Sequence, residues 1–168
     1  MNHNSHFSYE DVLEDNKHKI YRICRMYAVT PVEPQDLFQE VAYQIWKSFP
    51  NFKKQSSIST WVYRIALNVC LRSKLKLEKN SLKTIRYESI QFMASEASTN
   101  QQDDERYELL KSCIDTLQEV DKSIVVLYLD EVSYKEIAGI TGLSENHVAV
   151  KMKRIRKKLL DCLTPKLI

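Results

Sequence analysis

The densest group of residues that could do chemistry lies near the C-terminus, where six cations share one short segment. They are Lys151, Lys153, Arg154, Arg156, Lys157 and Lys158. Apolar residues recur among them at helical spacing: Val148, Met152, Ile155 and Leu159. This pattern predicts an amphipathic helix with one buried stripe and basic remaining faces. Because clustered cations neutralise phosphates, the segment is expected to bind a polyanion.

The residues just before this helix predict a tight turn and another helix. The only two glycines of the chain, Gly139 and Gly142, both lie here. Ser133 and Ser144 stand where a helix N-cap is wanted, and Glu136 follows Ser133 at capping-box spacing. Gly142 can supply the positive φ of a sharp turn. Together these signals predict a helix-turn-helix whose second helix enters the DNA major groove. A solvated basic helix in an ordinary bundle is the alternative.

The start of the second helix holds the side chains expected to reach base edges. These candidates are Ser144, Glu145, Asn146, His147, Ala149 and Val150, with Lys151 and Lys153 just behind. Asn can pair bidentately with adenine, Glu can accept from cytosine, and Ala or Val can contact a thymine methyl. The remaining cations, including Arg154, Lys157 and Lys158, are expected to contact phosphates and to make affinity depend on salt.

The first half of the chain combines aromatic and basic residues in a different way. A loop from Phe49 to Ser59 leads into a helix that contains Trp61, Tyr63, Arg64 and Asn68. Aromatic side chains interleaved with cations suit single-stranded or flipped bases, which stack and also need their phosphates neutralised. The alternative is that Trp61 is a core residue, which helical periodicity favours.

A pair of carboxylates, Asp36 and Glu40, lies at i and i+4 on another predicted helix. Paired carboxylates can serve acid–base catalysis, but no Ser/His/Asp constellation, phosphate-binding glycine loop or metal-ligand set accompanies them. A protein-docking face fits these two residues better, and a plain solvated face is the alternative. We therefore expect no enzymatic activity, no metal and no cofactor.

Composition favours an all-α protein. The chain has 168 residues, 43% of them hydrophobic, but only two glycines and four prolines, fewer than sheets and their turns usually need. The net charge of +3 is too small by itself to indicate nucleic acid. No apolar run approaches the roughly 20 residues of a membrane span, and the polar N-terminus lacks the apolar core of a signal peptide. We therefore expect a cytoplasmic protein.

The four cysteines, Cys24, Cys70, Cys113 and Cys162, are widely spaced and lie on apolar helical stripes. The sequence contains no CxxC pair, and the histidines do not accompany the cysteines at metal-ligand spacing. Buried free thiols are therefore expected rather than a zinc site or disulfides.

Periodicity divides the chain into two small helical domains. Residues 9–79 predict helices over about 9–27, 34–48 and 57–78, and residues 105–164 predict the second domain. Residues 80–104 have the polar composition of a linker. Apolar side chains that could dock onto a neighbouring surface interrupt it: Ile85, Tyr87, Ile90, Phe92 and Met93.

Three stretches of this sequence resemble one protein family. The runs DLFQEVAYQIWKSFPNF and SSISTWVYRIALNVCLRSKLK are similar to region 2 of the extracytoplasmic-function sigma factors of bacterial RNA polymerase. The tail VDKSIVVLYLDEVSYKEIAGITGLSENHVAVKMKRIRKKL resembles their region 4. The matches stand in the family's order and together cover most of residues 9–163. The resemblance implies an all-α, two-domain promoter-specificity subunit without catalysis of its own.

The resemblance also implies a role for each segment. One set matches the segment that docks on the β′ clamp helices of core RNA polymerase: Asp36, Leu37, Gln39 and Glu40. A second set matches the loop that captures a flipped base of the −10 element: Phe52, Lys53, Lys54, Gln55, Ser56 and Ser57. A third set matches the helix that contacts the −10 region where melting begins: Trp61, Tyr63, Arg64 and Asn68. The basic helix would read the −35 element as duplex.

The resemblance also implies that region 4 contacts the β flap of the polymerase. It implies an anti-sigma factor as a partner, and it implies no small-molecule substrate. The sequence departs from the family in the −10 loop, where Lys53-Lys54-Gln55 replaces a glycine-containing stretch, and at His147, Ala149 and Val150 in the recognition helix. Thymine-methyl or shape readout is possible there. A conventional helix-turn-helix regulator with a sensing or dimerising first domain is the alternative function, and an enzyme acting on DNA is a third class.

Overall fold

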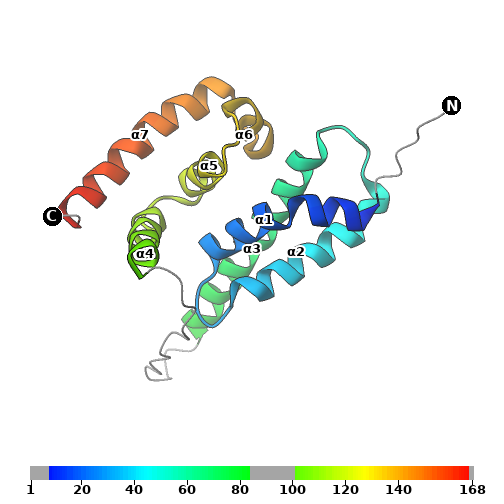
Figure 1. The fold of residues 1–168 in the computed structure, drawn as a ribbon, viewed down its shortest axis with the longest axis horizontal. Coiled ribbons are helices and arrows are strands. Elements are labelled where there is room, and N and C mark those ends of the chain that lie inside the picture. The colour runs from blue at the N-terminus through cyan, green and yellow to red at the C-terminus, as the bar shows by residue number, and fades with distance from the viewer. Residues whose placement is uncertain (1–7, 84–100, 167–168) are drawn as a thin grey trace.

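The computed structural model describes residues 8–83 and 101–166, and in these ranges every regular element is helical. The first domain contains α1 (Tyr9–Tyr27), α2 (Pro34–Ser48), the short 3-10 turn η1 (Phe49–Asn51) and α3 (Ile58–Lys83). The second contains α4 (Gln101–Asp115), α5 (Glu119–Leu129), α6 (Tyr134–Thr141), α7 (Glu145–Leu163) and η2 (Thr164–Lys166) (Figure 1). The predicted all-α fold is confirmed.

The helices of the first domain begin where local signals predict. The Ser8 hydroxyl accepts a hydrogen bond from the Asp11 N–H at 3.1 Å and caps α1, and Pro34 occupies the first turn of α2. α3 extends past its predicted end to Lys83, and α4 begins at Gln101. The predicted linker, 80–104, therefore starts and ends in helical residues. Its five apolar docking candidates lie outside the described residues.

The helix-turn-helix forms as the turn residues predict. Ser133 caps α6 in a reciprocal capping box with Glu136, and Ser144 caps α7. Gly142 ends α6 in the left-handed conformation, with φ of +77°, which a residue with a Cβ would adopt only with strain. The apolar stripe of α7 is buried through Val148, Met152 and Ile155. One face of α7 is therefore fixed against the domain core.

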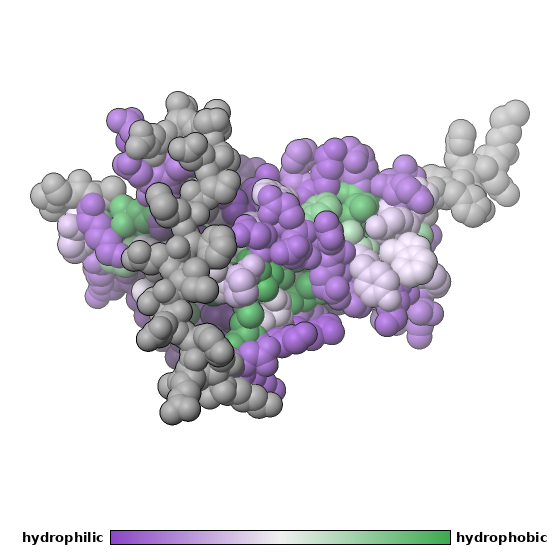
Figure 2. All heavy atoms as spheres, turned by 90° about the horizontal axis from the view of Figure 1, so that it is seen from below, coloured by the Kyte–Doolittle hydropathy of each residue, from purple (hydrophilic) through white to green (hydrophobic). Residues whose placement is uncertain are grey.

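The two domains lie against each other, with α3 next to α6 and the end of α1 close to α4 and α5 (Figure 1). A single hydrophobic cluster contains buried residues of both domains, from Val12 to Ile155. Figure 2 shows one face of the molecule, on which hydrophilic residues predominate and apolar residues emerge in small patches between them. Along the part of the chain that the structure describes, no helix is both long enough and apolar enough to cross a membrane.

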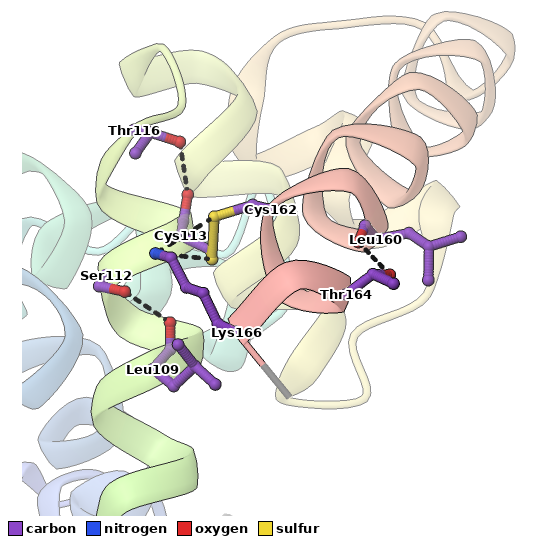
Figure 3. The surroundings of a disulfide bond; sticks show 8 residues. All are labelled: Leu109, Ser112, Cys113, Thr116, Leu160, Cys162, Thr164 and Lys166. Atoms are coloured by element: carbon purple, nitrogen blue, oxygen red, sulfur yellow. Dashed lines mark hydrogen bonds between the residues drawn. A yellow bond between two sulfur atoms is a disulfide. The ribbon is translucent and has the colours of Figure 1, made fainter. Parts of the chain in front are cut away.

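The cysteines correct one prediction. Cys24 and Cys70 are buried free thiols in the first domain, as expected. Cys113 on α4 and Cys162 on α7, however, form a disulfide (Figure 3). The prediction of free thiols is wrong for this pair because the two residues are 49 positions apart, and their proximity arises only from the packing of α4 against α7.

Candidate nucleic-acid and polymerase interface

The first turns of α7 present most of their predicted base-reading side chains to solvent. The exposed ones are Glu145, Asn146, His147 and Val150, whereas Ala149 is half-buried. The Ser144 hydroxyl accepts a hydrogen bond from the His147 N–H at 3.2 Å, so it caps the helix. A capped, rigid N-terminus with exposed polar side chains is the geometry that places a helix end in the major groove.

The cations of α7 fall into three environments. Lys153, Arg154 and Lys157 are exposed and form no ion pair within the described part of the chain. They are therefore open to phosphates.

The other three are held by α5. Lys151 and Lys158 both approach the Asp121 carboxylate, with N–O distances of 2.8 and 3.8 Å. Arg156 donates to the Tyr128 hydroxyl at 2.6 Å, and its guanidinium lies 5.0 Å from the centroid of that ring. The half-buried Lys151 is therefore less available to a base edge than its sequence position predicts.

The loop before α3 is built on stacked aromatic rings. Trp61 is half-buried, and its ring lies 4.9 Å from that of Phe52 and 6.5 Å from that of Phe49, between centroids. Trp61 therefore packs on the core, as the alternative predicted, and it also supports the loop, while its contact with bases stays a prediction. Lys53 and Lys54 project into solvent next to this platform.

The backbone of this loop adopts a glycine-like conformation at Lys54, within the stretch where the sequence lacks the family's glycine. Lys54 has φ of +53°, in the left-handed region that glycine adopts without strain. The loop thus keeps a glycine-like backbone while presenting a cation. The Ser57 hydroxyl accepts from the Thr60 N–H at 3.1 Å and caps α3, while Gln55 is exposed and Ser56 is half-buried.

α2 carries the carboxylates on its exposed face. Asp36, Gln39 and Glu40 are exposed, and Glu40 accepts a hydrogen bond from the Gln44 amide at 2.8 Å. A groove runs between these acids and the cationic side chains of Arg72 and Lys76 on α3.

Leu37 differs from the rest of the predicted docking set. It is 3% exposed and belongs to the hydrophobic core, so it mainly holds α2 in place, although it also lines the groove beside Asp36 and Glu40. Its burial follows from its position on the inward stripe of α2, which also contains Val41 and Ile45.

The second domain covers part of the face of α3 that was predicted to contact the −10 region. Tyr63 is 5% exposed, and its hydroxyl donates to the Asp130 carboxylate in the turn after α5. Arg22 on α1 pairs with the same carboxylate, which is 3% exposed. Arg64 donates to the carbonyl oxygen of Gly139 on α6. Asn68 remains exposed beside a groove between α3 and the second domain.

Further polar contacts join the two domains beside the shared hydrophobic cluster. The Tyr27 hydroxyl lies 3.0 Å from the Ser123 hydroxyl, and the buried ammonium of Lys122 lies 4.6 Å from the centroid of the Tyr27 ring. Lys74 on α3 forms an ion pair with Glu119 on α5. Burial raises the pKa of Tyr27 despite its hydrogen bond to Ser123, so its phenol stays neutral.

Asp130 was not among the predicted functional residues. Burial, followed by the hydrogen bond to Asp130, raises the pKa of Tyr63, so the phenol is a neutral donor to a charged acceptor. Asp130 bonds with residues about 67 and 108 positions away, and no local pattern in the sequence signals such a contact. Across residues 8–83 and 101–166, no three His, Cys, Asp or Glu side chains gather as a metal site.

Comparisons with known proteins agree with this geometry. Residues 12–79 match the family model of sigma-70 region 2, and residues 107–159 match that of sigma-70 region 4. The RNA polymerase sigma factor SigV of Bacillus subtilis is 25% identical over 153 residues, which cover 90% of this chain and 89% of SigV. The ECF RNA polymerase sigma factor SigW of the same organism is 24% identical over 173 residues, covering 92% and 90%.

Solved structures show the same fold. The sigma factor RpoE of Bartonella quintana, in complex with the anti-sigma factor NepR, superposes with a TM-score of 0.72 at 16% identity, covering 93% of this chain and 96% of RpoE. CnrH, in complex with the cytosolic domain of CnrY, gives a TM-score of 0.68 at 18% identity, covering 94% and 88%. With both region models matched in order and sigma factors aligned over almost the whole chain, the chain belongs to the sigma-70 family, as an extracytoplasmic-function sigma factor and thus a promoter-recognising subunit of RNA polymerase.

Proposed function

We propose that this sigma factor reads promoters at two points, with residues 9–79 acting on the −10 element and residues 105–164 on the −35 element. Residues 80–104 would connect the two and thread towards the RNA exit path. The observation that carries the proposal is the contrast between two surfaces. One is a capped helix with exposed polar side chains in its first turns and exposed cations further along, and the other is a loop with cations beside stacked aromatic rings.

The recognition helix supplies duplex readout. Glu145, Asn146 and His147 reach base edges, and Val150 contacts a thymine methyl. The exposed cations Lys153, Arg154 and Lys157 hold the flanking phosphates. Lys151 and Lys158 join them when phosphate replaces the Asp121 carboxylate.

The first domain supplies strand capture. A base that leaves the stack reaches the loop of Phe52 to Ser57, where Lys53 and Lys54 neutralise its phosphates. Trp61, Tyr63, Arg64 and Asn68 then contact the −10 region at the edge of melting. The aromatic platform under the loop supports this assignment, because stacked rings hold the loop rigid while its polar tip stays exposed.

Core polymerase docks on the exposed acidic face of α2. Asp36, Gln39 and Glu40 meet the β′ clamp helices, and the second domain meets the β flap. Exposed carboxylates on one face of a rigid helix suit a partner that presents cations. The protein itself then needs no catalytic group, cofactor or small-molecule substrate, since strand opening is driven by binding.

The free protein is closed in this proposal. The Tyr63 hydroxyl stays bonded to the Asp130 carboxylate, and the Arg64 guanidinium stays bonded to the Gly139 carbonyl oxygen. Core polymerase then separates the domains and spaces them on the promoter. The contact combines these polar pairs with apolar packing, and domains of one chain commonly move relative to each other, so docking energy can open it. Two weak DNA contacts on one scaffold then reinforce each other through effective concentration.

An anti-sigma factor is a further proposed partner, acting with this protein in the cytoplasm. Two solved structures with this fold are complexes with such a factor or with the cytosolic domain of CnrY, which supports the proposal by analogy.

A run-off transcription assay with purified core polymerase tests the function. We expect promoter-dependent transcripts only when both core enzyme and this protein are present. A conventional helix-turn-helix regulator would instead bind promoter DNA tightly without polymerase, often as a dimer on a palindrome. Failure to bind core enzyme and to support initiation would overturn the proposal.

A further inference from the structure

The disulfide joins the C-terminal ends of two helices of the second domain, α4 and α7. Cys113 is fully buried on α4, whereas Cys162 is half-buried in the last turn of α7. Their Cα atoms are 6.0 Å apart, which lies within the range that a disulfide needs. The fold of the two helices therefore already places the sulfurs for bond formation.

A cation lies beside both sulfurs. The Lys166 Nζ is 3.7 Å from the Cys162 Sγ and 3.8 Å from the Cys113 Sγ, and Figure 3 shows its side chain reaching back from η2 to the pair. An ammonium at this distance favours a thiolate over a thiol, and the thiolate is the reactive form of cysteine. The pair thus combines access, proximity and an activating charge.

The other two cysteines offer a comparison within the same chain. Cys24 and Cys70 are both buried in the first domain and remain unbonded. The hydrogen bond with Cys24 and burial raise the pKa of Cys70, so this thiol stays protonated. The Lys122 ammonium also acts on the Cys70 thiol, but it forms an ion pair with Asp115. Both first-domain cysteines are buried, so the solvent access of Cys162 is what distinguishes the second pair.

We propose that Cys113 and Cys162 form a reversible redox site that hydrogen peroxide oxidises from two thiols to the disulfide, fastening the end of the recognition helix to α4. In a reducing compartment the dithiol is the resting form, and the disulfide marks exposure to oxidant.

The reaction assigns a different task to each sulfur. The Cys162 thiolate attacks one peroxide oxygen; the O–O bond breaks, leaving a sulfenic acid on Cys162 and a hydroxide that takes a proton to become water. Cys113 loses its proton and attacks the Cys162 sulfur; the S–O bond breaks and a second water leaves. Two thiols lose two electrons in total, and peroxide is reduced to two waters. An external dithiol reverses the step by exchange.

The bond would restrain the element that reads DNA. It closes a long loop, because the cysteines are 49 positions apart, and it links α7 directly to α4. α4 also contacts the first domain: Arg25 lies 3.9 Å from the centroid of the Tyr107 ring, and Lys111 donates to the Ala28 carbonyl at 3.2 Å. Oxidation therefore stabilises the helix packing that supports both DNA reading and closure.

The test treats the reduced full-length protein with hydrogen peroxide and follows thiols by alkylation and peptide mass mapping. We expect the 113–162 disulfide to form first, leaving Cys24 and Cys70 free, and dithiothreitol to restore all four thiols. The thermal midpoint of the oxidised form should exceed that of the reduced form by several degrees, on the order of 10 °C. Equal oxidation of Cys24 and Cys70, or an unchanged midpoint, would overturn the proposal.

Two variants separate reactivity from folding. Lys166→Met keeps both cysteines and changes one exposed side chain, and we expect peroxide to form the disulfide about tenfold more slowly. Cys113→Ser leaves Cys162 without a partner, so its sulfenic acid should be trapped by dimedone. The double variant Cys24→Ser, Cys70→Ser is the matched control and should oxidise at the original rate. An unchanged rate in Lys166→Met would remove the activating role of the cation.

Discussion

The two surfaces proposed to bind DNA differ in how far contacts with the rest of the protein occupy them. The start of α7, the proposed base reader, is exposed, and the buried stripe of this helix faces away from it, so its availability does not depend on the first domain. On the corresponding face of α3, Tyr63 and Arg64 form hydrogen bonds with the second domain. In the proposed mechanism, closure therefore affects strand opening more than it affects duplex reading.

This difference has a physical origin in the kinds of contact involved. α7 is held by apolar burial, which persists in any arrangement of the domains. The contact between domains also has apolar packing, but it includes the polar group of Asp130, Tyr63 and Arg22, whose hydrogen bonds can be exchanged for bonds to water. In the proposed mechanism, the closed protein therefore leaves the start of α7 open to DNA while the second domain covers the face of α3.

The largest expected effect comes from Glu40→Lys. Reversing the charge on the docking face of α2 should weaken core binding about a hundredfold, because like charges across an interface cost several kcal/mol. Binding of a −35 duplex should not change, which separates the two domains sharply. Fluorescence anisotropy with labelled protein measures both. Asp15→Lys, an exposed reversal on α1, is the control; equal losses in the two variants would remove the docking assignment.

Asp130→Asn tests closure itself. The substitution keeps the shape of the side chain but removes the charge that Arg22 and Tyr63 share, so the open form should become roughly tenfold more populated. We expect a larger radius of gyration in small-angle X-ray scattering and tighter binding of a single-stranded −10 oligonucleotide. Duplex binding by α7 should stay the same.

Its control is the neighbouring Glu131→Gln, an exposed carboxylate outside any ion pair in the described structure. It should leave both measurements unchanged. Identical scattering from Asp130→Asn and the unaltered protein would show that closure does not depend on this carboxylate.

Removing two free cations from α7 should have a smaller, uniform effect. Lys153→Ala with Lys157→Ala deletes two expected phosphate contacts, so affinity for the −35 duplex should fall several-fold and the log–log salt slope should decrease by about 2. A scrambled duplex should lose affinity to the same extent. Loss confined to the cognate sequence would instead show that these lysines read bases.

Asn146→Ala should change total affinity by about as little, roughly fivefold. Losing one base contact costs about 1 kcal/mol on the cognate −35 duplex. The variant should bind duplexes altered at the contacted base pair about equally well, because only discrimination is lost. A competition series with each base pair changed in turn checks this. Preserved discrimination at every position would exclude Asn146 as a base reader.

Local features were predictable from the sequence, and contacts between distant segments were not. The caps at Ser133 and Ser144 and the turn at Gly142 depend on neighbouring residues, and all three stand where they were expected. Asp130 and the Cys113–Cys162 pair depend on which helices meet in space. Periodicity marks Cys113 as buried, yet it contains no information about the sulfur across from it.

Leu37 shows a different limit. A family motif assigns a segment to a partner, but helical geometry gives each residue of that segment its own direction. Its neighbours Asp36 and Gln39 face solvent, while Leu37 faces the core. The motif therefore predicts a docking helix, and burial shows which of its side chains face solvent.

Asp121 gives the recognition helix an anion of its own. Because its single carboxylate approaches both Lys151 and Lys158, these two ammonium groups share one negative charge and are partly neutralised before any phosphate binds them. A phosphate that binds them takes the place of a fixed carboxylate and displaces fewer dissolved ions. The affinity that these two lysines add should thus depend on competition between the DNA phosphate and the Asp121 carboxylate, which is fixed in the protein.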